Sequence, residues 1–207
     1  MPDRRSMVER QLRARGIDDE RVLAAMARVP RELFVPPAAR VHAYEDAALP
    51  IGSDQTISQP YMVARICAEL RLRGHEKVLD VGTGSGYQAA VLAELAAEVH
   101  SIERIPELVG AAGAALAEAG YAGRVHVVEG DGSLGLPDEA PFGAIAVAAA
   151  APAPPQALLD QLERGGRLVI PIGPPDQQFL RVYIATHEGP ADYAAVPCRF
   201  VPLVNKH

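Results

Sequence analysis

Short apolar runs alternate with stretches of helical periodicity over the last two thirds of the chain. Runs with the length and β-branched content of buried strands lie at 77–81, 99–103, 124–131, 144–150 and 167–173. Helical spacing follows at 87–97, 106–119 and 156–164. Two more strand-like runs, 179–186 and 198–204, are joined by a turn at Gly189-Pro190. This order predicts an α/β fold, in which a doubly wound, mostly parallel sheet ends in a C-terminal antiparallel strand.

The front of the chain has a different pattern. Residues 7–15 show helical spacing and end at Gly16, and Asp18 or Asp19 can cap a second helix that runs to about Arg28. Turn-forming residues break the stretch 31–60, and Pro60 suits the first turn of a helix that reaches about residue 72. We expect one domain over 1–207, in which a helical and irregular segment, 1–74, packs across the carboxyl edge of the sheet in an α/β core, 75–207.

Composition narrows the class of protein. With 49% hydrophobic and 22% charged residues, the 207-residue chain has the makeup of a globular protein with a sizeable core. Its net charge of −6 argues against nucleic-acid binding. Two cysteines cannot form a disulfide framework, and the charged first residues do not resemble a signal peptide. No apolar stretch is long enough to span a membrane, so we expect a cytoplasmic enzyme. The six histidines lack ligand spacing, and no metal site is expected.

The first strand of the core leads into a glycine-rich loop. Asp80 lies in that strand, and the loop contains Gly82, Thr83, Gly84, Ser85 and Gly86. Glycines at this point let the backbone approach a ligand at the carboxyl edge of the sheet. A dinucleotide site would require glycine at position 87, where this chain has tyrosine. The spacing favours the loop of S-adenosylmethionine methyltransferases, while a nicotinamide or flavin site and a tight turn without ligand remain alternatives.

Acidic residues follow the next two strands. Glu103 ends the second strand, where a carboxylate can accept hydrogen bonds from both ribose hydroxyls of an adenosine ligand. Asp131 and Gly132 follow the third strand, where the carboxylate can accept from the adenine amine and glycine leaves room for the ring. The simpler alternatives are a surface pair of Glu103 with Arg104, and an Asp131 that only caps a turn. The combination of three acids at successive strand ends, Asp80, Glu103 and Asp131, is stronger evidence for a ligand site than any one of them alone.

A polar run, QTISQP, precedes the helix that starts at Pro60. Ser58 or Gln59 could serve only as a helix cap. No histidine or acid adjoins Ser58 to activate it as a nucleophile, and the loop Gly84-Ser85-Gly86 lacks the spacing of a serine-hydrolase elbow.

Taken together, these motifs resemble the protein-L-isoaspartate O-methyltransferase family. The resemblance runs from about Met7 to Val204 and is carried by MVERQLRARGI, RVPRELFVP, AYEDAALPIG, QTISQPYMVA, VLDVGTGSGYQAAVLA, ERIPEL, GDG, GGRLVIPIG and RFVPLV. The glycine loop is shared by many methyltransferases, whereas QTISQPYM, GTGSGYQAA and the terminal FVPL are specific to this family.

The resemblance implies a function and a set of site residues. The enzyme would transfer a methyl group from S-adenosylmethionine to the free α-carboxylate of L-isoaspartyl, and also D-aspartyl, residues in damaged or unfolded proteins and peptides. The residues implied to contact the cofactor are Gln55, Thr56, Ile57, Ser58, Asp80, Gly82, Thr83, Gly84, Ser85, Gly86, Glu103, Asp131 and Gly132. Ser58 would lie at the methyl-transfer centre as the catalytic residue, and Ser58, Val201, Pro202 and Leu203 would contact the substrate. The resemblance also implies a strand inserted antiparallel near the end of the sheet, and the enzyme is expected to be a monomer.

Two positions depart from the family pattern. Gly143 stands where the family usually has aspartate, and Ala148 where it usually has threonine. Three other functions remain possible from the sequence: a methyltransferase for another carboxylate, small molecule or RNA, a protein that binds S-adenosylmethionine or unfolded peptide without turnover, and an NAD-dependent oxidoreductase. The first lacks the N/D-P-P-Y/F motif of amine methylation, and the last lacks the third fingerprint glycine.

Overall fold

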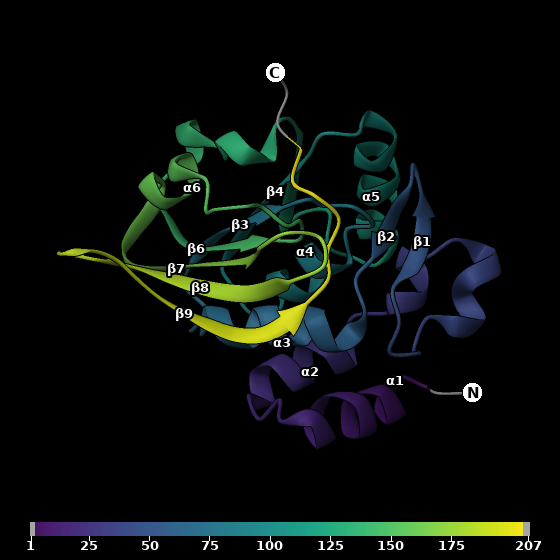
Figure 1. The fold of residues 1–207 in the computed structure, drawn as a ribbon. Coiled ribbons are helices and arrows are strands. Elements are labelled where there is room, and N and C mark those ends of the chain that lie inside the picture. Colours follow the sequence, from purple (N-terminus) through teal and green to yellow (C-terminus); the bar gives the residue numbers. More distant parts are fainter. Residues whose placement is uncertain (1–2, 205–207) are drawn as a thin grey trace.

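A seven-stranded sheet forms the centre of the computed structural model, which describes residues 3–204 (Figure 1). The expectations for the first two residues and for His207 lie outside the described residues. The strands are β3 (Lys77–Val81), β4 (Glu98–Glu103), β5 (Val125–Glu129), β6 (Phe142–Val147), β7 (Leu162–Ile172), β8 (Gln178–Thr186) and β9 (Gly189–Cys198). Their order is β5-β4-β3-β6-β7-β8-β9. The first five are parallel neighbours, and β8 pairs antiparallel with β7 and β9. The predicted fold class is confirmed.

Six α-helices accompany the sheet within residues 3–204. They are α1 (Arg4–Ser6), α2 (Glu20–Arg28), α3 (Pro60–Leu70), α4 (Tyr87–Ala93), α5 (Pro106–Glu118) and α6 (Gln156–Asp160). The predicted cap of α2 is Asp19, whose carboxylate accepts from two backbone N–H groups of the first turn. The predicted helix over 7–15 continues α1 as a π-helical and then a 3-10 segment, and it ends at Gly16 with φ of +84°. Proline at the first position of α3 and α5 fits the start of a helix because it has no N–H to leave unpaired.

Alternating side chains divide the core between the two faces of the sheet. Along β3, Val78 faces a cluster with α2, α3 and α4, whereas Leu79 and Val81 face a cluster with α6. The first cluster also contains Met7, Leu12 and other apolar residues of the front segment. The described part of this segment, residues 3–74, therefore packs mainly on one face of the sheet. We expected the whole segment to pack across the carboxyl edge, but within the described residues it lines the pockets there only from Ala48 onward.

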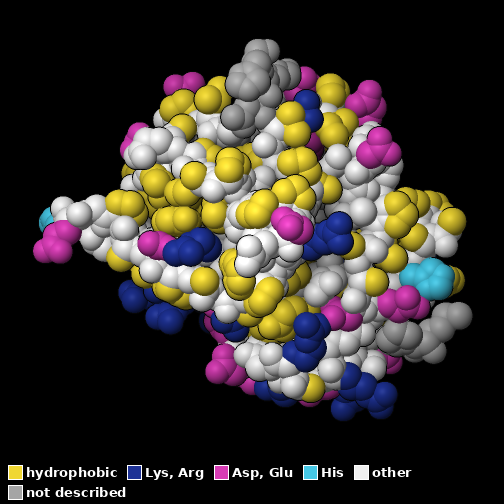
Figure 2. All heavy atoms as spheres, in the orientation of Figure 1, with side chains coloured by type: hydrophobic (Ala, Val, Ile, Leu, Met, Phe, Trp, Pro, Cys, Tyr) yellow, Lys and Arg dark blue, Asp and Glu magenta, His cyan; other side chains and the backbone are white. Residues whose placement is uncertain are grey.

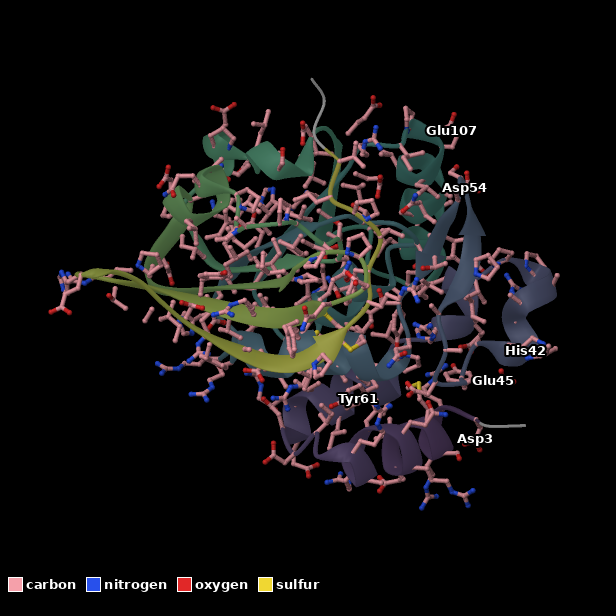
Figure 3. The ribbon with its side chains drawn as sticks, in the orientation of Figure 1. Asp3, His42, Glu45, Asp54, Tyr61 and Glu107 are labelled. Atoms are coloured by element: carbon pink, nitrogen blue, oxygen red, sulfur yellow. The ribbon has the colours of Figure 1, made fainter. Side chains whose placement is uncertain are left out.

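That part forms a two-stranded hairpin, which the sequence pattern left irregular. Strands β1 (Leu49–Gly52) and β2 (Gln55–Ile57) pair antiparallel. Ser53 and Asp54 between them both have positive φ, as a type I′ turn requires. Asp54 marks the tip of the hairpin in Figure 3. The hairpin brings the polar run 55–58 to the carboxyl edge of the sheet.

The predicted end of the chain is wrong in three respects. The last strand is β9, which ends at Cys198, where the pattern placed the beginning of a strand over 198–204. The turn before it lies at His187 and Glu188, because Gly189 already pairs with Thr186. Strand β9 also lies at the sheet edge beside β8 and is not inserted between earlier strands. After Cys198 the chain leaves the sheet and crosses its carboxyl edge (Figure 1). The Gln178 side chain exchanges two hydrogen bonds with the Phe200 backbone, and a bridge pairs Ala150 with Pro202.

Two helices are shorter than predicted, and one strand is longer. Helix α4 ends at Ala93, because the chain must turn to enter β4 at Glu98. Helix α6 ends at Asp160, and Leu162, expected in that helix, pairs with Phe142 as the first residue of β7. The register between these strands shifts beside Gly143. A Cβ at Gly143 would lie 3.0 Å from atoms of Glu76 and Glu163. Glycine in place of the aspartate usual in the family therefore leaves room for these two side chains to pack against the strand.

Surface side chains are mixed in sign on the face seen in Figure 2. Hydrophobic side chains gather over the sheet, and Lys and Arg are most frequent toward the helices of the N-terminal segment, where acidic groups accompany them. Ion pairs in the N-terminal segment include Arg13 with Glu20 and Arg4 with Glu32. Within residues 3–204, no helix is both long and apolar enough to cross a membrane.

Candidate active site

A pocket of about 250 Å³ opens at the carboxyl edge of the sheet, beyond β3, β4 and β6. Segments far apart in the sequence line it, among them the run after β1, the glycine loop, the end of β4, the residues after β6 and the segment after β9. Among the predicted site residues, those that line the pocket are Gln55, Thr56, Ile57, Ser58, Gly82, Thr83, Gly84, Ser85, Glu103, Gly132, Val201, Pro202 and Leu203. The fold thus brings together groups that the sequence separates by more than a hundred residues.

The glycine loop turns sharply between β3 and α4. Gly82 and Gly86 have φ of +90° and +88°, a region that residues with a side chain rarely adopt. Gly86 starts α4 against Leu116 and Ala112 of α5, and it does not line the pocket. The loop therefore needs glycine both for its path and for helix packing, while Gly82, Thr83, Gly84 and Ser85 form the pocket wall.

Glu103 holds the loops on both sides of the pocket. Its Oε2 accepts from the Gly84 N–H at 2.9 Å, and its Oε1 accepts from the N–H groups of Arg104 at 2.9 Å and Ile105 at 3.0 Å. The side chain is only 6% exposed. The alternative of a solvent-exposed pair with Arg104 is therefore wrong. A carboxylate with two oxygens has about four acceptor positions, so Glu103 keeps capacity for a donor from a ligand.

Asp80 is fully buried behind the pocket wall and does not line the pocket. Its Oδ2 accepts from Ser101 Oγ at 2.7 Å, and Ser101 Oγ lies 2.6 Å from Thr83 Oγ1. Because Ser101 donates its only proton to Asp80, Thr83 donates to Ser101. The other oxygen, Oδ1, accepts from Gln88 Nε2 at 2.8 Å. Burial raises the Asp80 pKa to about 6; these donors lower it, and the charge of Glu103 adds to the rise.

A second pocket of about 420 Å³ adjoins the first. The two pockets share four lining residues, Thr56, Ser58, Ala148 and Val201. Ser58 is half-buried at this junction. It does not cap α3, whose cap residue Gln59 makes no side-chain capping bond either. The capping alternative for this run is therefore wrong. Arg199 is the one charged side chain that lines the second pocket among the described residues.

Asp131 lies beside the first pocket without lining it. Its Oδ1 accepts from the N–H and the hydroxyl of Ser133, at 2.9 and 2.7 Å, and so caps the 3-10 turn Gly132–Leu134. The turn-capping alternative is thus present in the structure. A ligand contact for Asp80, Gly86 or Asp131 stays a prediction.

Sequence reasoning missed several residues of the pocket wall. They are Asp54, Val63, Val81, Tyr87, Gln88, Ile102, Arg104, Ile105, Ala148, Ala149 and Val204. Most are apolar residues whose periodicity indicated only core. Gln88 is polar and buried, unlike the apolar majority of these residues. Its position just after the glycine loop was the one sequence feature that could have indicated a place in the pocket wall. Within residues 3–204, no group of three or more His, Cys, Asp or Glu side chains could hold a metal ion.

Comparison with known proteins gives a consistent result. The family model for protein-L-isoaspartate(D-aspartate) O-methyltransferase (PCMT) matches residues 3–207. A protein-L-isoaspartate O-methyltransferase of Methanoculleus marisnigri is 54% identical over 99% of this chain and 92% of its own. One from Marinobacter nauticus, protein-L-isoaspartate O-methyltransferase 2, is 56% identical over 98% of this chain and 93% of its own.

A solved structure resembles the whole fold. The crystal structure from Plasmodium falciparum described as PCMT, in complex with S-adenosyl-L-homocysteine, has a TM-score of 0.84 and 26% identity and covers 99% of both chains. The family match extends over nearly the entire sequence, and the relatives are more than half identical. The chain belongs to the protein-L-isoaspartate(D-aspartate) O-methyltransferase family.

Proposed function

We propose that this enzyme methylates the free α-carboxylate of L-isoaspartyl residues, and also of D-aspartyl residues, in damaged proteins and peptides. S-adenosylmethionine supplies an electrophilic methyl group on its sulfonium when bound. The observation that carries the proposal is the position of Ser58 at the junction of two pockets, one beside the glycine loop and Glu103, the other beside Arg199. A methyl donor and a methyl acceptor held in adjoining pockets can meet only there.

The first pocket fits an adenosyl amino acid with a positive sulfonium. Glu103 accepts from Gly84 of the glycine loop, and the buried Asp80 accepts from Gln88 just after that loop, so two carboxyl groups lie at or behind this wall of the pocket. We assign ribose contacts to Glu103 and adenine contacts to Gly132 and its neighbour Asp131. Gly82 to Ser85 face the amino-acid end, and Gln55 to Ser58 cover the cofactor from the hairpin. A Cβ at Gly132 would lie 2.5 Å from Val81 Cγ1, which supports a requirement for glycine at this point of the wall.

The second pocket fits an anionic acceptor. An isoaspartyl α-carboxylate is ionised at neutral pH and is already a nucleophile, so no strong general base is needed. Arg199 attracts the anion, and Val201 lines both pockets while Pro202 and Leu203 line the first. The Ser58 hydroxyl donates a hydrogen bond that orients the acceptor carboxylate. Alignment in attack geometry and exclusion of water then provide the rate enhancement.

Repair follows from the ester product. The backbone nitrogen of the next residue attacks the methyl ester carbonyl, methanol leaves, and a succinimide forms. Water opens the succinimide at either carbonyl, and one of the two products is normal aspartate. The ester only needs to leave the enzyme, so these steps require no further group of the protein.

A pair of synthetic peptides tests the proposed function. The peptides differ only in carrying isoaspartate or normal aspartate at one position, and the methyl donor is radiolabelled. We expect base-labile label on the isoaspartyl peptide alone, because a methyl ester hydrolyses in base. If both peptides stay unlabelled while the cofactor binds, the acceptor is another carboxylate or small molecule, or the protein binds without turnover.

Replacement of Ser58 by alanine tests the assigned transfer centre. We expect kcat to fall by about tenfold, the effect of one lost hydrogen bond to a charged group. Affinity for S-adenosylhomocysteine should stay unchanged, because the main chain at Ser58 still covers the cofactor. Thr56→Ala, at the same junction, is the matched control: its affinity for the cofactor can change, but its kcat at saturating cofactor should match that of the wild type. Unchanged turnover in Ser58→Ala would refute the role.

We propose further that residues 1–74 and 75–207 form one domain, and that the enzyme is a cytoplasmic monomer acting on damaged or unfolded polypeptides, with neither nucleic acid nor membrane as partner. One hydrophobic cluster contains residues of both parts, which supports a common core. Cys67 and Cys198 are free thiols, as is usual in reducing compartments.

A further inference from the structure

Gln88 has a buried acceptor that the protein does not use. The side chain is only 7% exposed, yet it lines the first pocket. Its Oε1 is buried and has no hydrogen-bond partner among the described residues. A buried carbonyl without a donor is costly, and such groups are uncommon in native proteins.

The orientation of the amide is fixed by Asp80. Gln88 Nε2 lies 2.8 Å from Asp80 Oδ1, and an ionised carboxylate can only accept. Rotation of the amide by 180° would place two acceptors against each other, so Oε1 is held away from Asp80. Asp80 is held in turn by Ser101, whose hydroxyl donates to the other carboxylate oxygen at 2.7 Å. The unused acceptor is therefore fixed in direction before any ligand binds.

The charge behind Gln88 favours a cationic donor. The Asp80 carboxylate polarises the amide and makes Oε1 a stronger acceptor. The charge of Glu103 acts on the same region. A positive donor in the pocket would also offset the buried negative charge, whereas a neutral hydroxyl would not.

On the cofactor placement proposed above, we infer that Gln88 Oε1 accepts a hydrogen bond from the α-ammonium of the amino-acid part of the cofactor. Glu103 ends β4 and Gly132 lies after β5, whereas Gln88 is bonded to β3. The ribose and adenine donors thus have nearer partners, and the ammonium is the remaining donor. Asp80 serves this contact as a positioning residue through Gln88, without touching the ligand.

Calorimetric titration with two ligands tests the inference. One is S-adenosylhomocysteine, and the other is its deamino analogue, which keeps the adenosine, thioether and carboxylate. Gln88→Leu preserves the approximate size of the side chain and removes both polar atoms. We expect this variant to bind S-adenosylhomocysteine roughly tenfold more weakly and the deamino analogue nearly as well as the wild type does. Titrations at pH 8 keep Asp80 ionised in the wild type, since its pKa is about 6.

Control variants separate this contact from general damage. Gln55→Leu removes an amide from the hairpin side of the same pocket, where its Nε2 donates to Ser53 O, and it should not discriminate between the two ligands. Gln88→Met provides a second variant should the leucine variant fail to fold. Equal loss of affinity for both ligands in a folded Gln88 variant would overturn the inference and leave the proposed function standing. Failure of the wild type to bind either ligand would overturn the cofactor placement itself.

Discussion

Glu103→Gln is expected to weaken binding of S-adenosylmethionine by about 100-fold. The carboxylate accepts three backbone N–H bonds, from Gly84 on one oxygen and from Arg104 and Ile105 on the other. Glutamine has one carbonyl oxygen and one NH₂ group. The NH₂ group would therefore face backbone N–H donors, either that of Gly84 or those of Arg104 and Ile105, and their hydrogen bonds would be lost. Loss of a hydrogen bond to a charged group costs about 1.5–3 kcal/mol, and the upper end corresponds to about 100-fold. The proposed ribose contact is lost in addition.

The effect should appear in cofactor affinity and not in chemistry. Calorimetric titration gives the Kd, and we expect a raised KM for the cofactor with kcat recovered at saturation. Glu107→Gln, at an exposed position in the first turn of α5, is the matched control and should bind normally (Figure 3). A change in Kd below about threefold, well short of one charged hydrogen bond, would contradict the role of Glu103 as organiser of the pocket.

The parallel part of the fold could be predicted because local pattern and topology agree. Strands β3 and β4 are short apolar runs followed by turns and helices, and both begin and end within one residue of the predicted bounds. The carboxyl ends of neighbouring parallel strands meet at one edge, so the pattern alone predicts that the glycine loop and Glu103 face one ligand.

The end of the chain could not be predicted from its pattern. The run CRFVPLV has the composition of a strand, but Val201, Pro202 and Leu203 owe their apolar character to the pocket they border. A segment that lines a pocket and a strand buried in a sheet are both rich in apolar residues, so composition alone does not distinguish them. The strand itself, β9, is largely exposed and contains Pro190 and Pro197, so its pattern suggested a turn.

The roles of Ser58 and Gln88 show a similar limit for the site. No neighbouring residue in the sequence marks Ser58 as reactive, and its place at the junction of the two pockets depends on Ala148 and Val201, which are distant in the sequence. Gln88 stands among apolar and small residues in a short helix, where an amide carries no pattern of its own. In both cases long-range packing, and not the local sequence, places the side chain at the pocket.

Asp80→Asn is expected to make the protein more stable at pH 8 while weakening its affinity for the cofactor. Burial raises the Asp80 pKa from 3.8 to about 6 in the folded state. Folding therefore favours the protonated acid, and its stabilising contribution is complete below about pH 4. This contribution is lost as the pH rises through 6. A shift of about two pKa units corresponds to roughly 3 kcal/mol, which the wild type forfeits above pH 7 and a neutral asparagine does not.

Asparagine also changes the direction of the Gln88 amide. If its NH₂ group faces Gln88, the glutamine must turn its oxygen toward position 80, and the acceptor inferred for the cofactor ammonium is lost from the pocket.

Urea unfolding between pH 4 and 8 should show a free energy of unfolding that falls with pH more steeply in the wild type than in Asp80→Asn. Asp138→Asn, at an exposed position, should follow the wild type. Parallel curves for the wild type and Asp80→Asn would show that the buried carboxylate carries no such cost. A gain in stability coupled to a loss of cofactor affinity would instead mean that the fold accepts a buried charge because that charge holds Gln88 toward the ligand.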